Sequence, residues 1–274
     1  MADRQFTLSS GRKMGMTAVG EALSVRVVIM CHPMPGAGTF DPKPVISRKH
    51  EARILAFDRP GYGGSEPLGA DEPSTVQARA DDIAEFILSQ QMADQTIGAP
   101  DVGVIGWGFG GAVALSLAAR HPSVVSRVAV VGLSRPALWN EQDAPLPALV
   151  NGPPKPGPPT FDWDVLGIDS DDPALAYPGV SDRLDVMLAE AAAQGTIGVE
   201  TDARAVKDFS WADELGSMVA DTALIYGTSE RFTNSASGRW LKRRIPHARI
   251  VRVPTARGLT IVSVWQQILD HVTA

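Results

Sequence analysis

The stretch Gly106-Trp107-Gly108-Phe109-Gly110-Gly111 has the residue types of a sharp turn whose backbone can take part in chemistry. It lies between the strand-length apolar run 102–107 and the small-residue run 110–120, which is typical of a helix. Backbone N–H groups at the start of a helix can bind an oxygen that gains negative charge. We therefore predict a tight strand-to-helix turn at Gly108, with an N–H donor at Phe109.

Other residue patterns in the sequence give weaker evidence for a functional site than this turn does. The pattern G-x-G-x-G-G could bind a dinucleotide, but no acidic residue closes a second strand about 20 residues further on. Cys31 and His32 are neighbours on a predicted strand and point to opposite faces, so we expect Cys31 to be a small buried side chain. The sequence has no metal-ligand spacing and no phosphate-binding loop, and we expect no cofactor and no metal. Four histidines are expected to be surface, loop or capping groups: His50, His121, His247 and His271.

Continuous apolar runs predict the strands that would position the turn. Such runs are typical of strands buried on both faces of a parallel sheet. Residues 4–20 predict a preceding hairpin that turns near Ser10-Gly11. The predicted strands are 26–32, 52–58, 102–107, 126–132, 221–227 and 248–254.

Helical patterns alternate with these strands. Ser74 and Gln77 predict a capping box at the start of one helix, and Asn234 predicts the cap of another that runs to Arg244. The runs 110–120 and 262–272 complete the set. Alternating strands and helices predict an α/β fold with a mostly parallel, doubly wound sheet.

One segment interrupts this alternation. Residues 134–216 are too many for a loop and begin with a proline-rich stretch. A helical pattern and two tryptophans follow, so we predict an inserted helical lid with a proline-rich entry. The alternative is a disordered linker. Residues 1–133 and 217–274 then form the core.

Four motifs occur in this chain, each next to a predicted strand, and their order along the chain is more specific than any one of them alone. They are "VVIMCHPMPGAGTF", "ILAFDRPGYGGSEP", the glycine-rich turn, and "ALIYGTSERF" with "IPHARIVRVPTARGL". The chain resembles the α/β-hydrolase fold family in these motifs over nearly its whole length. In that family the turn carries the pattern G-x-S-x-G, with a nucleophilic serine at its centre.

The resemblance implies a role for each matching position. Gly108 takes the place of the serine, Gly258 that of the histidine, and Glu230 that of the acid. The oxyanion donors would be the N–H groups of Met34 and Phe109. Pro33 stands where the family has glycine, and His32 matches a histidine that is usually structural. The pocket is expected to be lined by His32, Pro33, Trp107 and Arg257.

Composition limits the partners. The net charge is −6, whereas nucleic-acid-binding surfaces are normally basic, so we expect no nucleic acid. The basic run 241–244 is expected to be the solvated end of a helix. Residues 102–119 are uncharged but rich in glycine, so we predict a strand, turn and helix there and no membrane span. The single cysteine and the polar N-terminus favour a cytoplasmic protein. No oligomeric state follows from the sequence.

The missing serine and histidine leave four hypotheses. The first is a protein that binds a small or lipid-like molecule beneath the lid, without triad hydrolysis. The second is a non-hydrolytic cyclase, lyase or isomerase that uses the oxyanion donors with Glu230 or Arg257. The third is an esterase- or lipase-like hydrolase in an engineered form, or with its nucleophile elsewhere. The fourth is a structural or protein-binding role.

Overall fold

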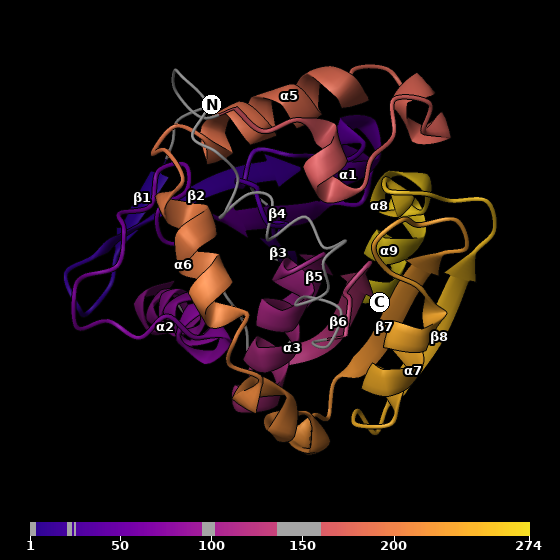
Figure 1. The fold of residues 1–274 in the computed structure, drawn as a ribbon. Helices are drawn as coiled ribbons and strands as arrows, with labels where there is room; N and C mark the ends of the chain where they lie inside the picture. The colour runs from indigo at the N-terminus through magenta and orange to yellow at the C-terminus, as the bar shows by residue number, and fades with distance from the viewer. Residues whose placement is uncertain (1–3, 21–23, 25, 95–101, 136–159) are drawn as a thin grey trace.

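The computed structural model describes residues 4–20, 24, 26–94, 102–135 and 160–274 (Figure 1). These residues form a sheet of eight strands in the order β1-β2-β4-β3-β5-β6-β7-β8. β1 with β2 and β2 with β4 pair antiparallel, and the remaining neighbours are parallel. The strands are β1 Arg4–Thr7, β2 Lys13–Gly20, β3 Arg26–Cys31, β4 Ala52–Phe57, β5 Val102–Trp107, β6 Val125–Val131, β7 Asp221–Gly227 and β8 Ala248–Val253.

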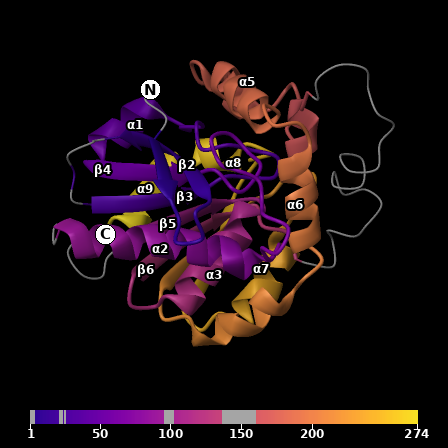
Figure 2. The same ribbon diagram turned by 90° about the vertical axis from the view of Figure 1, so that its left-hand side faces the viewer.

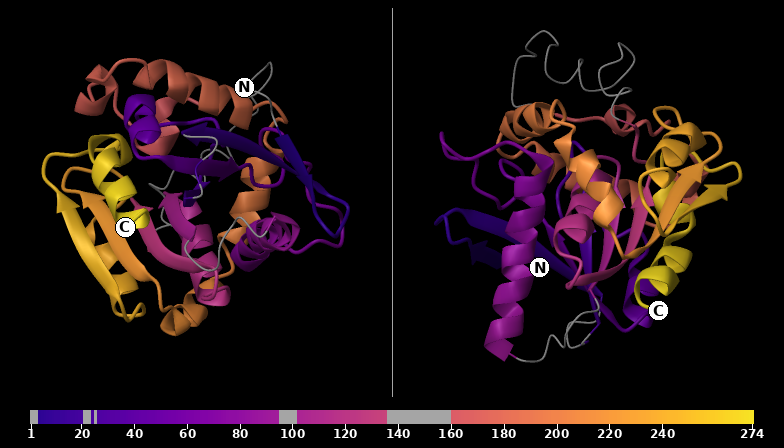
Figure 3. Two further views of the ribbon diagram at one scale, coloured as in Figure 1. Left: turned by 180° about the vertical axis from the view of Figure 1, so that it is seen from behind. Right: turned by 90° about the horizontal axis from the view of Figure 1, so that it is seen from below.

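Helices cover both faces of this sheet (Figures 1 and 3). Successive side chains of a strand point to opposite faces. Ile29 of β3 therefore packs with α2 and α3, while Val28 and Met30 pack with α9. The predicted doubly wound α/β fold is confirmed. The helices outside the insertion are α1 Pro44–Lys49, α2 Val76–Asp94, α3 Gly110–Arg120, α7 Ser235–Lys242, α8 Thr260–Ser263 and α9 Trp265–Val272.

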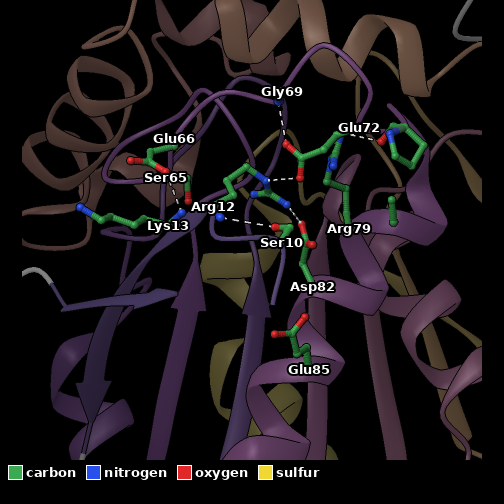
Figure 4. Close-up of polar contacts among 12 residues, drawn as sticks. Ser10, Arg12, Lys13, Ser65, Glu66, Gly69, Glu72, Arg79, Asp82 and Glu85 are labelled. Atoms are coloured by element: carbon green, nitrogen blue, oxygen red, sulfur yellow. Dashed lines mark hydrogen bonds and ion pairs between the residues drawn. The ribbon is translucent and has the colours of Figure 1, made fainter. Parts of the chain in front are cut away.

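The predicted N-terminal hairpin is formed by β1 and β2. Its turn contains Gly11 with φ +87°, a left-handed conformation that favours glycine. Arg12, at the end of this turn, donates from Nε to Glu72 at 2.8 Å and from Nη2 to Asp82 at 2.5 Å (Figure 4). Because Asp82 belongs to α2, this ion-pair cluster fixes the hairpin to the rest of the fold.

A long insertion separates β6 from β7. After residue 159, the described part contains η2 Trp163–Leu166, η3 Pro173–Ala176, α5 Val180–Ala191, α6 Ile197–Ala205 and η4 Ser210–Ser217, which ends where the core resumes. Figure 2 shows α5 and α6 outside the sheet. Arg183 of α5 donates to the backbone oxygen of Asp41 at 2.7 Å, and Asp172 accepts from Leu259 N at 3.0 Å. Most of the proline-rich entry, 136–159, lies outside the described residues.

Two predicted helix details differ from the structure. Ser74 and Gln77 form no capping box: Ser74 donates to Thr201 O, Gln77 donates to Ser210 Oγ, and Thr75 caps α2 instead by accepting from Ala78 N. The predicted helix 262–272 is divided, because Val264 leaves helical geometry with φ −116° and ψ 22°. Asn234 does cap α7, by accepting from Ala236 N at 2.8 Å. None of the helices in the described ranges combines the length and the apolar composition that a membrane-spanning helix needs.

Candidate functional site

The ends of three neighbouring parallel strands form the centre of the candidate site. Gly108, directly after β5, donates its N–H to Val131 O at 2.9 Å. Gly132, directly after β6, donates its N–H to Ile225 O at 3.0 Å. The residues after β5, β6 and β7 therefore lie side by side at the carboxyl edge of the sheet, where parallel α/β sheets bind their ligands.

The turn predicted at Gly108 is present between β5 and α3. Gly108 has φ +55°, in the left-handed region. The turn also packs closely, because a Cβ atom on Gly106 would lie 2.5 Å from the Cα of Gly111. A Cβ atom on Gly110 would meet the carbonyl oxygen of Cys31. Small residues are thus required around this turn, whereas a Cβ atom on Gly108 itself would find its nearest neighbour, Pro33 Cβ, at 3.5 Å.

Two backbone N–H groups lie beside this turn. Phe109 directly precedes α3, so its N–H belongs to the positive end of that helix. The carbonyl of Pro33 accepts from Arg59 Nη2 at 2.8 Å. In a trans peptide the C=O and N–H point in opposite directions, so the Met34 N–H points away from Arg59. Among the described residues, the Met34 N–H has no hydrogen-bond partner.

His32 is buried and does not face the turn as a base. Its Nε2 accepts from Arg59 N at 3.0 Å, and its Nδ1 lies 2.8 Å from Pro33 O. Burial and the positive charge of Arg59 hold the pKa of His32 well below its ordinary value. The imidazole is therefore neutral and serves to shape the loop that contains Met34.

Glu230 lies after β7, three residues beyond Gly227. Its Oε1 accepts from Gly227 N at 2.9 Å and lies 2.6 Å from Thr260 Oγ1. Thr260 Oγ1 is also 2.8 Å from Arg257 O. A hydroxyl has a single proton to donate, so Glu230 Oε1 and Arg257 O compete as acceptors for the proton of Thr260. Burial raises the pKa of Glu230 to about 7, and its Oε2 is buried with no partner among the described residues.

The loop after β8 contains Arg257 and Gly258. Arg257 Nη1 lies 2.7 Å from Asp171 Oδ1, and Asp171 is largely exposed, so this guanidinium is held in a surface ion pair. A Cβ atom on Gly258 would lie 2.5 Å from the carbonyl oxygen of Gly167 and 2.9 Å from Ile168 Cα. The backbone that ends η2 therefore fills the space that a side chain at 258 would need.

Trp107 and Cys31 end neighbouring strands on opposite faces of the sheet. Trp107 is buried and its ring lies 5.3 Å from that of Phe40. Cys31 packs with the α2 and α3 side, and burial raises the pKa of its thiol to about 12. A cavity of about 10 Å³ borders Cys31, which is room for one water at most. Cys31 is therefore an inert core residue at neutral pH.

The remaining histidines lie away from the turn. His121 Nε2 is 2.9 Å from Asp81, His271 Nε2 is 3.1 Å from Val128 O, and His50 Nε2 is 3.5 Å from Asp270. His247 is exposed before β8. Within the described ranges, no group of three or more His, Cys, Asp or Glu side chains is arranged to hold a metal ion.

Comparison with known proteins identifies the fold. A family model described as the alpha/beta hydrolase fold matches residues 26–154. Solved hydrolase structures match nearly the whole chain: a hydrolase from Pseudomonas aeruginosa PA01 has a TM-score of 0.72, with 98% of this chain and 96% of that chain covered and 21% identity. The chain has the α/β-hydrolase fold.

Two further relatives of this α/β-hydrolase chain are esterases. An esterase from Exiguobacterium antarcticum has a TM-score of 0.74 with 17% identity, covering 98% of this chain and 97% of that chain. A pimeloyl-[acyl-carrier protein] methyl ester esterase from Aromatoleum aromaticum is 27% identical over 213 residues, which is 73% of this chain and 78% of the relative. The family and its esterase-like relatives agree with the resemblance seen in the four motifs.

Arg59 and Asp202 also contribute to this site, although no sequence pattern predicts their role. Arg59 follows β4 and Asp202 belongs to α6, 143 residues later; the two form a buried ion pair at 2.7 Å. No local pattern pairs residues so far apart. The available signal is Arg59 itself, a cation placed directly after a buried strand, where a charge needs a partner.

Proposed function

We propose that this protein with the α/β-hydrolase fold binds a small acyl compound at the carboxyl edge of the sheet and does not hydrolyse it through a Ser-His-acid triad. In this proposal Gly108 holds the nucleophile position and Gly258 the histidine position. Hydrolysis by such a triad needs a hydroxyl or thiol and an imidazole that takes its proton, and glycine provides neither.

The packing around Gly258 carries the proposal. The carbonyl of Gly167 and the Cα of Ile168 occupy the space beside Gly258, so a histidine there would require this backbone to move. An ordinary hydrolase altered only at its catalytic residues would keep that space open. The closed space therefore supports a site that has evolved without the imidazole, and it disfavours an engineered loss.

The donors favour an acyl ligand. In this proposal a carbonyl or carboxylate oxygen binds between the Met34 N–H and the N-terminus of α3, because N–H groups at a helix start favour negative charge. By their names, one of the similar proteins is an esterase and the other is a pimeloyl-[acyl-carrier protein] methyl ester esterase. In this proposal the insertion 134–216 is the lid of the site, the ligand is the expected partner, and the buried single cysteine suits the cytoplasm.

Activated acyl esters and a fluorophosphonate probe test the proposal directly. We expect no ester cleavage above that of buffer and no mass adduct on the protein. Native mass spectrometry of gently purified protein is expected to detect a retained small molecule that is released on unfolding. Turnover or an adduct would overturn the proposal, and peptide mapping would then identify the nucleophile.

A second candidate, a non-hydrolytic enzyme, is favoured by one observation at Glu230. Its Oε2 is buried without a partner among the described residues, and its pKa of about 7 suits proton transfer at neutral pH. An acid that gives or takes one proton beside the oxyanion donors could serve an isomerase or lyase. In this case Glu230→Gln abolishes turnover of the retained compound while binding persists. Arg257, the other candidate group, is already held by Asp171.

The third hypothesis, an engineered hydrolase, has its own test. The double variant Gly108→Ser with Gly258→His restores ester cleavage if the surrounding site is intact. We expect no restoration, because the imidazole has no space. Restored cleavage at a rate typical of an esterase would support the engineered form and contradict the proposed function.

A further inference from the structure

Arg59 joins three parts of the molecule through one guanidinium. Its Nε and Nη2 donate to the Asp202 carboxylate at 3.0 and 2.7 Å. Its Nη1 donates to His32 O at 2.6 Å, and its Nη2 also donates to Pro33 O at 2.8 Å. The guanidinium carbon lies 5.0 Å from the ring centre of Phe109. The insertion helix α6, the loop after β3 and the turn after β5 thus meet at this side chain.

This ion pair is closed to water. The Asp202 side chain is 0% exposed and that of Arg59 is 4% exposed. α6 also approaches the loop after β4 closely, because a Cβ atom on Gly198 would lie 2.8 Å from Gly61 O. A buried charge that loses its partner is costly, so Asp202 fixes the position of Arg59.

The direction of the Met34 N–H follows from these contacts. Arg59 Nη2 and His32 Nδ1 both bind the carbonyl of Pro33, which shares a planar peptide with Met34 N. A carbonyl held from two sides cannot rotate without losing both hydrogen bonds. The N–H on the other side of the same peptide is then held towards the opposite direction.

We propose that Asp202 is a positioning residue which, through Arg59, aims the Met34 N–H at the oxygen of a bound acyl ligand. The insertion thereby helps to build the oxyanion donor of the core. This inference rests on the proposed function, because that function gives the Met34 N–H its ligand. It adds a residue of α6 that acts on the ligand without touching it.

A variant pair separates positioning from stability. Asp202→Asn leaves Arg59 buried without its anion and is expected to lower stability. Arg59→Met combined with Asp202→Leu removes both charges, and buried ion pairs can often be replaced by apolar residues without loss of stability. The double variant is therefore expected to fold while losing the contacts of Arg59 with the carbonyls of Pro33 and His32, so that only His32 Nδ1 still binds Pro33 O. Asp82→Asn, which breaks a comparable contact with Arg12, is the matched control.

Octanoate and 1-octanol serve as probes, with the protein labelled with ¹⁵N in its methionines. In the wild type, octanoate is expected to shift the Met34 amide proton downfield. In the double variant this shift disappears and octanoate binds about 10- to 100-fold more weakly, the loss expected for a charge-assisted hydrogen bond. The affinity for 1-octanol changes much less, since it carries no anion. Asp82→Asn keeps both the shift and the affinity.

The outcomes distinguish the two proposals. If the double variant binds octanoate as the wild type does, with the same Met34 shift, the positioning role is overturned and the proposed function stands. If octanoate leaves the Met34 resonance of the wild type unchanged, the proposed function fails for acyl ligands and the inference fails with it. Equal weakening of both probes in the double variant also overturns the positioning role, because it indicates a general loss of structure.

Discussion

The carbonyl oxygen of Gly167 lies 2.5 Å from the position that a Cβ atom would take on Gly258. Gly167 ends η2 in the insertion and has φ +71°, while Gly258 lies in the loop after β8. Side chains do not approach a backbone oxygen so closely. The packing of the insertion against the core therefore requires a residue without a side chain at position 258.

Gly258→Ala is expected to lower the free energy of unfolding by about 1–3 kcal/mol, the usual cost of overpacking, because backbone atoms must move to admit the methyl group. Gly258→His is expected to cost more. Urea denaturation followed by circular dichroism measures both. Gly216→Ala is the control, because a Cβ atom there meets nothing within 4 Å. If Gly258→Ala is no less stable than this control, the contact with Gly167 does not constrain the site.

Gly108→Ser is expected to fold with a lower melting temperature. A Cβ atom fits at this position, so the cost arises from the left-handed backbone and is about 1–2 kcal/mol. Gly11→Ser, at φ +87° in an open turn, shares the backbone conformation and is the matched control. We expect similar losses in the two variants by differential scanning calorimetry. An unchanged or higher melting temperature for Gly108→Ser would show that the turn is not strained.

Glu230 makes stability depend on pH. Burial raises its pKa to about 7 in the folded protein, against 4.5 for an ordinary glutamate. The folded state thus holds this proton between pH 4.5 and 7, where the unfolded state has released it. The contribution is complete below pH 4.5 and is lost as pH rises through 7, up to about 3 kcal/mol. Urea denaturation from pH 4.5 to 8 is expected to show this fall in the wild type and its absence in Glu230→Gln. Parallel curves for the two proteins would contradict the assignment.

Thr260 affects the pKa of Glu230. Its hydroxyl lies 2.6 Å from Glu230 Oε1, and this hydrogen bond lowers the pKa of the carboxyl against the effect of burial. Thr260→Val is therefore expected to raise the pKa of Glu230 above its wild-type value, as measured by ¹³C NMR of the labelled carboxyl group. Thr233→Val is the control, because the buried Thr233 hydroxyl has no partner among the described residues. A pKa that is unchanged in Thr260→Val would exclude this hydrogen bond.

Much of the sheet could be predicted from the sequence because its signals are local. The apolar run 102–107 became β5 with the predicted bounds, and the run 126–132 became β6, displaced by one residue. A strand buried on both faces has the same residue types wherever it packs. Helix caps also depend on partners that are distant in the sequence. The hydroxyl of Ser74 donates to Thr201 O on α6, so it does not form the capping box that the local pattern predicts.

The candidate site likewise has some features that local sequence predicts and others that depend on distant residues. The turn at Gly108 could be predicted, since its glycines are adjacent in the sequence. The pair of Arg59 and Asp202, and the block of Gly258 by Gly167, could not, because they join the core to an insertion far away in the chain. The sequence predicts that Arg257 lines the pocket, but the ion pair of Arg257 with Asp171 of the insertion cannot be predicted from local sequence.

The buried pair of Arg59 and Asp202 limits how freely this chain could be shortened. A minimal core that joined residue 133 to residue 217 would keep a guanidinium placed to meet a carboxylate that no longer exists. Because an unpaired buried charge is costly, either water would enter the core to hydrate Arg59 or the loop after β4 would move outwards to expose it. The insertion is therefore not a removable module, and any compact derivative of this protein has to replace Arg59 in the same step.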